Sequence, residues 1–245
     1  MSRRAVSLVC VALLSLTLAA CGSSKKSSSS SSSGSKTSEA TTTTEAAATD
    51  SAADKAKAQA INLKAEDFPD GWTSTPSSND NSDETDKELY TCAGLSDPKT
   101  STTADEHSPD FSKGQFTMVS SEVQFAKSKD AAKKDLEILK SDKFSGCLKT
   151  AFDNEMKKQA SGAGGNVGES KVEKTAAPSG TDGSAAFRMT VPITAVGQTF
   201  TFYIDFTMLL QGRAEVTLVC FNGNAPFDSA LKGTLTGKLV QRMTA

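Results

Sequence analysis

The chain is poor in the residues on which many enzymes depend. Its 245 residues include one histidine, His107, in the polar stretch Asp105–Pro109, which we expect to be a solvent-exposed loop. Nucleophilic catalysis by a Ser/His or Cys/His pair needs that histidine beside the nucleophile and an orienting acid, and no Gly-x-Ser-x-Gly motif occurs. Metal centres need several ligands at recognisable spacing. No such spacing is found, so we expect no metal, no other cofactor and no enzyme activity.

The chain also lacks the features of several common binding proteins. Residues 61–245 carry 20 Lys and Arg against 25 Asp and Glu, a net charge of about −5 without a basic stripe, so no nucleic acid partner is expected. The carboxylates of Asn79–Asp86 lack the glycine and final glutamate of a calcium loop. The glycines of Ser161–Gly168 miss the GxGxxG spacing of a nucleotide loop. Both segments are therefore expected to be ordinary connections.

The N-terminus has the pattern of an export signal. Arg3 and Arg4 precede the apolar run Ala5–Leu18, which is followed by two alanines and Cys21. The run is shorter than the ~20 residues that a membrane-spanning helix needs. Leu18-Ala19-Ala20-Cys21 resembles the lipobox of bacterial lipoproteins. The resemblance implies cleavage before Cys21, a diacylglyceryl cysteine with further acylation such as palmitate, and stable attachment to the extracytoplasmic face of the cell membrane.

Three parts of the chain are predicted. Residues 1–20 are the lipoprotein signal peptide, 21–60 the lipidated cysteine with a Ser/Thr-rich tether, and 61–245 a single globular domain. The tether includes seven consecutive serines, Ser27–Ser33, and no large apolar side chain. Such a segment cannot offset its conformational entropy by burial, and we expect it to be disordered, with a frayed helix at Ala46–Ala60 as the open alternative.

Three cysteines remain in the domain once Cys10 and Cys21 are assigned to the signal and the anchor. An oxidising compartment allows one disulfide among them, and three pairings are open. Cys92 and Cys147 lie in predicted helices with polar flanks, whereas Cys220 lies on the apolar face of a predicted strand. This placement favours the pair Cys92–Cys147.

Hydrophobic periodicity predicts an α+β fold with a twisted antiparallel sheet packed against helices. Helices are expected at 84–95, 129–140 with Ser128 as N-cap, 142–159 and 226–243. A strand is expected at 115–125, with a bulge near Val119-Ser120. The strongest pattern is a meander of three strands over Ala185–Phe221 with one buried face.

The meander is rich in phenylalanine. Phe187, Phe200, Phe202 and Phe206 alternate with polar residues and are candidates for the lining of a ligand groove, although the same pattern is typical of an ordinary core.

The domain as a whole also resembles a known group of proteins. The resemblance rests on Phe68-Pro69-Asp70-Gly71-Trp72, on Cys92, on Cys147-Leu148 and on the C-terminal order of a meander followed by a helix. The domain resembles actinobacterial lipoproteins whose domains are similar to the extracellular sensor domain of a mycobacterial Ser/Thr kinase, or to the related PsbP/Mog1-like fold. The resemblance covers about residues 61–245 and implies a twisted sheet with a groove suspected of binding a ligand. That sensor domain has two disulfides, whereas three cysteines here allow one. No catalytic residue comes with it.

Three functional hypotheses follow. The first is a non-catalytic, membrane-anchored binding or sensor-like domain whose partner is a small apolar ligand or an envelope component or protein. The second is a protein–protein interaction or structural envelope module without a pocket. The third, less favoured, is a hydrolase that uses His107 or carboxylates, which requires His107 within hydrogen-bond reach of Ser, Cys, Asp or Glu in a cleft.

Overall fold

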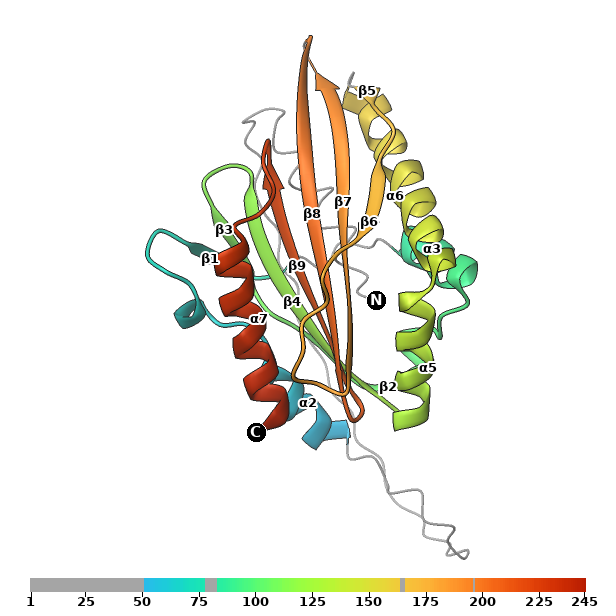
Figure 1. Cartoon of the computed structure of the whole chain (residues 1–245), viewed down its shortest axis with the longest axis vertical. Coiled ribbons are helices and arrows are strands. Elements are labelled where there is room, and N and C mark those ends of the chain that lie inside the picture. Colours follow the sequence, from blue (N-terminus) through green and yellow to red (C-terminus); the bar gives the residue numbers. More distant parts are fainter. Residues whose placement is uncertain (1–50, 78–82, 164–165, 196) are drawn as a thin grey trace, which may run out of the picture.

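The computed structural model describes residues 51–77, 83–163, 166–195 and 197–245. The predicted signal peptide, Cys21 and residues 78–82 lie outside these ranges. The fold is α+β, as predicted: a nine-stranded antiparallel sheet lies between two layers of helices (Figure 1). Within the described residues, none of the helices combines the length and the apolar character that crossing a membrane requires.

The elements follow one another along the chain as follows. The helices are α2 (Ser51–Ile61), α3 (Asp83–Ala93), α4 (Pro98–Ser101), α5 (Lys129–Lys140), α6 (Asp142–Ala163) and α7 (Ser229–Thr244), with a 3-10 turn at Ala65–Asp67. The strands are β1 (Thr73–Thr75), β2 (Thr102–His107), β3 (Asp110–Lys113), β4 (Thr117–Ala126), β5 (Asn166–Val167), β6 (Lys171–Lys174), β7 (Gly183–Ala195), β8 (Gln198–Gln211) and β9 (Ala214–Gly223). The strand order is β1-β3-β4-β9-β8-β7-β5, while β2 also pairs with β4 and β6 with β7.

Strands β7, β8 and β9 form the predicted meander, and β7 and β8 are among the longest strands of the sheet. β8 pairs antiparallel with β7 along its whole length and with β9 from Phe202 to Gln211. The β8–β9 turn consists of Gly212 and Arg213, and Gly212 adopts a φ of +61°, which favours glycine. This hairpin fixes the register, and therefore decides which side chains of β9 face each helical layer.

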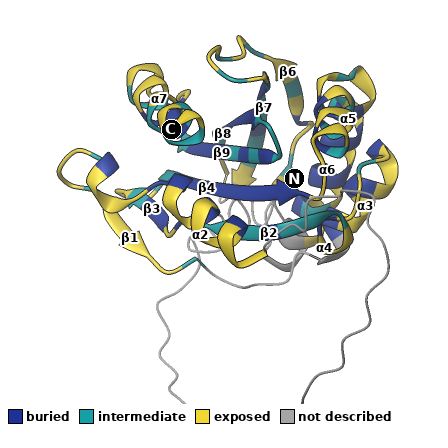
Figure 2. Ribbon diagram, turned by 90° about the horizontal axis from the view of Figure 1, so that it is seen from below, coloured by how far each residue is buried: buried dark blue, intermediate teal, exposed yellow. Residues whose placement is uncertain are grey.

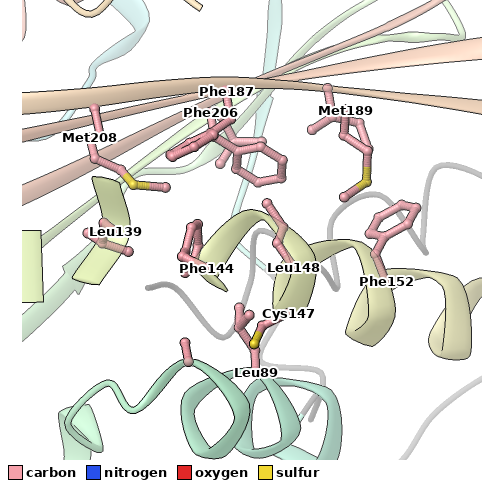
Figure 3. Close-up of a cluster of buried hydrophobic side chains, with 14 of the residues drawn as sticks. Leu89, Leu139, Phe144, Cys147, Leu148, Phe152, Phe187, Met189, Phe206 and Met208 are labelled. Atoms are coloured by element: carbon pink, nitrogen blue, oxygen red, sulfur yellow. The ribbon is translucent and has the colours of Figure 1, made fainter. Parts of the chain in front are cut away.

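Both faces of the sheet are buried, whereas the sequence predicted one buried face. One core lies between the sheet and α3, α5 and α6 (Figure 3). A second core lies between the sheet and α2 and α7, and Figure 2 shows buried strands between two sets of helices with exposed outer surfaces. Asp205 and Thr207, polar residues that alternate with the apolar residues of β8, are buried on the second face. Their partner is α7, which the alternation within β8 could not reveal.

Double burial also explains an error on β4. Its pairing with β9 runs without interruption from Thr117 to Phe125, so the predicted bulge at Val119-Ser120 is absent. Met118 packs in the first core and Val119 in the second. The prediction assumed that only one face of β4 was covered. Under that assumption, apolar residues that point to opposite faces seem to break the alternation of the strand, and the break was interpreted as a bulge.

Helix α2 extends the ordered domain to Ser51, ten residues before its predicted start, so the last part of the predicted disordered tether is folded. Ala58 and Ile61 pack in the second core, and Asp54 is 3% exposed. Arg213 donates two hydrogen bonds to Asp54, at 2.7 and 2.9 Å, across 159 residues of sequence. A helix held by a distant ion pair carries little apolar pattern, which is why composition alone suggested disorder.

The remaining helices agree with their patterns. Ser128 caps α5, with its Oγ accepting from the Ala131 amide, as predicted. α3 and α7 lie close to their expected ranges, and α6 continues four residues beyond its expected end. The disulfide Cys92–Cys147 joins α3 to α6, which confirms the predicted pair, and Cys220 is free and buried.

Candidate functional site

The buried carboxylates on the α2 and α7 side of the sheet each have a basic partner. Asp54 pairs with Arg213, Asp67 with Arg242 and Lys238, and Asp205 with Arg188 and Lys232. Burial alone would raise the pKa of each of these carboxyls, but hydrogen bonds from the basic side chains, joined at Asp54 by one from Thr103, outweigh it and lower the pKa. These pairs are satisfied and hold α2 and α7 against the sheet.

The opposite face carries acids without such partners, of which Glu122 is buried and the others are half-buried. Its members lie on β2, β4, β9 and α5, and we call them the acidic cluster: Asp105, His107, Glu122, Asp135 and Glu215. No Lys or Arg within the described residues forms an ion pair with any of its four carboxyls. An unpaired buried acid is a candidate for function, because a structural role would favour a neutralising partner.

The register of the sheet brings the cluster together. His107 on β2 lies directly opposite Glu122 on β4, and Glu122 lies opposite Thr217 on β9. Two residues along, Asp105 lies opposite Gln124, which in turn lies opposite Glu215. Side chains two residues apart on a strand share a face, so these residues form two polar rows across three strands beneath α5.

Distances within the cluster are short. His107 Nε2 lies 3.3 Å from Asp105 Oδ1 and 3.8 Å from Glu122 Oε1. Gln124 Nε2 donates to Glu122 Oε1 at 2.7 Å. Glu122 Oε2 is buried and accepts no hydrogen bond, which is unusual, since buried polar atoms are nearly always partnered. The neighbour of the buried Asp105 Oδ1 is His107 Nε2.

The carboxyls of the cluster have shifted pKa values. Burial, and next the negative charge of Asp105, raise the pKa of Glu122 well above its usual range. Burial also tends to raise the pKa of Asp105, but contacts with His107 and Glu122 lower it overall. Burial raises the pKa of Asp135, and raises that of Glu215 to about 7 with a contribution from Asp135. The cluster therefore holds protons at neutral pH that exposed carboxyls would release.

A small cavity adjoins the cluster. It has a volume of about 40 Å³ and is lined by polar groups of Glu122, Gln124, Asp135 and Glu215 together with apolar groups of α5 and β8. A site of this size admits a water molecule or an ion and excludes a lipid chain. No Lys or Arg lines it.

A larger and more open cleft lies on the other side of the sheet, beside α7. Its volume is about 480 Å³, and its walls come from the segment Ala176–Ser179, from Thr207 and from one face of α7. Gly233 and Gly237 have no side chains, so that face of α7 leaves room for the cleft. Lys232, the charged residue in the lining, already forms an ion pair with Asp205. The cleft has room for a ligand but offers few unsatisfied groups to recognise one.

The candidate groove residues lie elsewhere. Phe187, Phe202 and Phe206 are at most 2% exposed in the first core, against which Phe200 packs partly buried. Figure 3 shows Phe187 and Phe206 beside residues of α6. Neither cavity described above is lined by any of the four rings. A groove made by these residues stays a prediction without geometric support.

His107 differs from its expected position. It is the last residue of β2, with a side chain 16% exposed, and the expected solvent-exposed loop is wrong because this segment pairs with β4. Its neighbours are the carboxyls of Asp105 and Glu122, and no sequence motif predicted this arrangement. An available signal was Glu122 itself, an acid in the middle of a strand whose neighbours are buried.

Comparisons with known proteins give one structural neighbour to report. No known protein family matches the chain, and no curated protein matches it. Among solved structures, the chain is similar to the extracellular domain of PknH from Mycobacterium tuberculosis, with 9% identity and a TM-score of 0.38 over 78% of this chain and 96% of that one. This is the kind of domain that the sequence resembles, but a TM-score this low carries no argument about fold or function.

Proposed function

We propose that the chain is an extracytoplasmic lipoprotein, held to the membrane by a lipid on Cys21, whose domain binds a ligand without catalysing a reaction. The observation that carries this proposal is the disulfide between α3 and α6. Disulfides persist in oxidising compartments and are rare in the cytosol. A disulfide-bonded domain behind a lipobox is consistent with export followed by lipid anchoring.

The surroundings of His107 support a binding role over hydrolysis. Its Nε2 lies within hydrogen-bond reach of Asp105, which meets part of the requirement of the hydrolase hypothesis, but no Ser or Cys side chain among the described residues is its partner. The neighbouring hydroxyl of Ser108 is engaged with Pro109 O and with the amide of Ser121. A nucleophile next to a base, which acyl transfer requires, is not assembled in the described part of the chain.

The acidic cluster favours a cationic ligand over the apolar ligand expected from the sequence. Four carboxyls without basic partners create a negative potential on this face, and the adjoining cavity is small and polar. The cleft beside α7 is the second candidate, favoured by its volume of about 480 Å³.

Replacement of Cys21 tests the proposal. Cys21→Ala removes the acceptor of the lipid, so the protein should leave the membrane fraction or accumulate with its signal uncleaved. Cys10→Ala is the matched control, because Cys10 lies in the part that is removed. Fractionation followed by immunoblotting measures both. Membrane retention and mature mass unchanged in Cys21→Ala would contradict lipid anchoring.

A further inference from the structure

We propose that Asp105, His107 and Glu122 form a binding site for a divalent first-row transition metal ion of the Zn²⁺ class. The inference deepens the proposed function, because it names the ligand class of the acidic cluster. One imidazole nitrogen and two carboxylate oxygens are ligands that Zn²⁺ accepts, and such three-residue sites leave a position open for water or a further ligand.

The spacing of the three groups fits one ion. One ligand atom from each residue lies within 4.8 Å of the others. Ligands at 2.0–2.2 Å from a tetrahedral Zn²⁺ lie about 3.4 Å from one another. The observed separations from His107 Nε2, 3.3 Å to Asp105 Oδ1 and 3.8 Å to Glu122 Oε1, are close to that value, and Oε2 belongs to the same Glu122 carboxyl. Small side-chain rotations would therefore complete the coordination.

A buried carboxylate oxygen without a hydrogen-bond donor points to a cation independently of the spacing. Glu122 is 4% exposed, and its Oε2 accepts no hydrogen bond in a cluster where Asp105 Oδ1 is a further buried carboxylate oxygen. Burying a carboxylate oxygen without a partner is costly. A cation held between Glu122 and Asp105 would give both carboxyls a positively charged partner.

The supporting residues are already in place. Gln124 donates to Glu122 Oε1 and so orients the carboxyl, as outer groups commonly do at metal sites. Exposure rises from 4% at Glu122 to 16% at His107 and 30% at Asp105, which leaves one side of the site open to solvent. An ion can enter from the Asp105 side and keep water ligands there.

The ligand set also selects among cations. Ca²⁺ and Mg²⁺ prefer sites made of oxygen ligands, whereas imidazole suits Zn²⁺ and its neighbours in the first row. The inference therefore commits to a transition metal, and Mg²⁺ should not compete for the site.

The test is a titration of the full processed chain, purified in detergent through a tag free of histidine and stripped with a chelator. Zn²⁺ should bind one per chain by isothermal titration calorimetry. Because the chain contains a single histidine, the ¹⁵N signals of one imidazole report the site directly, and one ring nitrogen should shift on saturation. Excess Mg²⁺ should leave the binding curve unchanged.

Three variants and one control separate a metal site from adventitious binding. Glu122→Gln, His107→Ala and Asp105→Asn should each weaken Zn²⁺ binding at least tenfold. Glu106→Gln is the control, because it removes a carboxylate from β2, the strand that carries Asp105 and His107. The Glu106 side chain faces α2, where it contacts Gln59 and Lys55, so the affinity for Zn²⁺ should stay within threefold of the wild type. Asp105→Asn, at the exposed side of the site, serves if Glu122→Gln fails to fold.

Two results would overturn the metal site: no saturable uptake of one Zn²⁺ per chain, or uptake that leaves the imidazole signals and the affinities of all three variants unchanged. Either result would leave the proposed membrane anchoring standing, because fractionation of Cys21→Ala tests anchoring separately.

Discussion

Buried carboxyl groups divide by the face of the sheet on which they lie. Asp54, Asp67 and Asp205 bind Arg or Lys on the α2 and α7 side, whereas the buried Glu122 and the half-buried Glu215 lie on the α5 side without a base. The first group stabilises the fold through charge pairs. The second raises the free energy of the folded state when it ionises, a cost that residues at binding sites commonly carry.

Glu215 gives this cost a measurable pH dependence. Burial raises its pKa from 4.5 to about 7, with Asp135 on α5 as the charged neighbour. The folded state therefore keeps a proton that the unfolded state loses above pH 4.5. The contribution of Glu215 to the unfolding free energy is fully present below that pH and is lost as pH rises through 7, by at most about 3.5 kcal/mol at ~1.4 kcal/mol per pKa unit.

We therefore expect Glu215→Gln to reduce the loss of unfolding free energy between pH 5 and pH 8, measured by denaturant titration at both values. Glu122 is buried with a raised pKa, so a part of the loss should remain. Glu106→Gln, on the other side of β2, should behave as the wild type. An identical pH dependence in the wild type and Glu215→Gln would show that Glu215 ionises as freely in the folded chain as in the unfolded one.

The candidate site could be predicted only in part from the residues. The single histidine drew attention to His107, and the polar stretch around it suggested a loop because Ala104 alone among Thr102–His107 is an apolar buried residue. Edge pairing with β4, 15 residues later in the chain at the His107–Glu122 pair, made this stretch a strand. Pairing between strands is a property of the fold, so no local spacing could bring Glu122 to His107.

At the scale of elements, hydrophobic periodicity was sufficient to predict a helix or strand where its apolar residues followed one regular spacing. The meander β7–β8–β9, the capped helix α5 and the disulfide-bearing helices α3 and α6 follow their patterns closely. The failures have one cause, which is burial by an element far away in sequence. α7 covers the polar face of β8, both cores share β4, and Arg213 holds α2.

The disulfide links two of these elements and should contribute strongly to stability. Cys92 and Cys147 are 55 residues apart, and closing a loop of that length restricts the unfolded chain by up to about 4 kcal/mol in the chain-entropy model. We expect the double variant Cys92→Ala/Cys147→Ala to lose about 2–4 kcal/mol of unfolding free energy in denaturant titration.

A reductant provides the control. Dithiothreitol should lower the stability of the wild type towards that of the double variant and leave the double variant unchanged, because Cys220 is a buried free thiol without a partner to lose. Equal stability of the wild type and the double variant without reductant would mean that the bond does not form in the protein as it is produced.

At the scale of the whole molecule, the account joins an N-terminal anchor to a domain with an acidic binding face. The described part of the chain begins at Ser51, and 30 residues from Cys21 to Asp50 separate it from the proposed lipid. A chain of that length, if flexible, spans about 30 Å on average. The acidic cluster would then face the extracytoplasmic medium, from which a cation could reach it.

The most direct measurement of the central claim is the mass of the N-terminal peptide of the protein isolated from membranes. The account predicts a peptide that begins at Cys21 and carries the added mass of diacylglycerol, with or without an acyl chain on its amino group. A peptide that begins at another residue, or an unmodified Cys21, would contradict lipid anchoring and with it the proposed place of the domain.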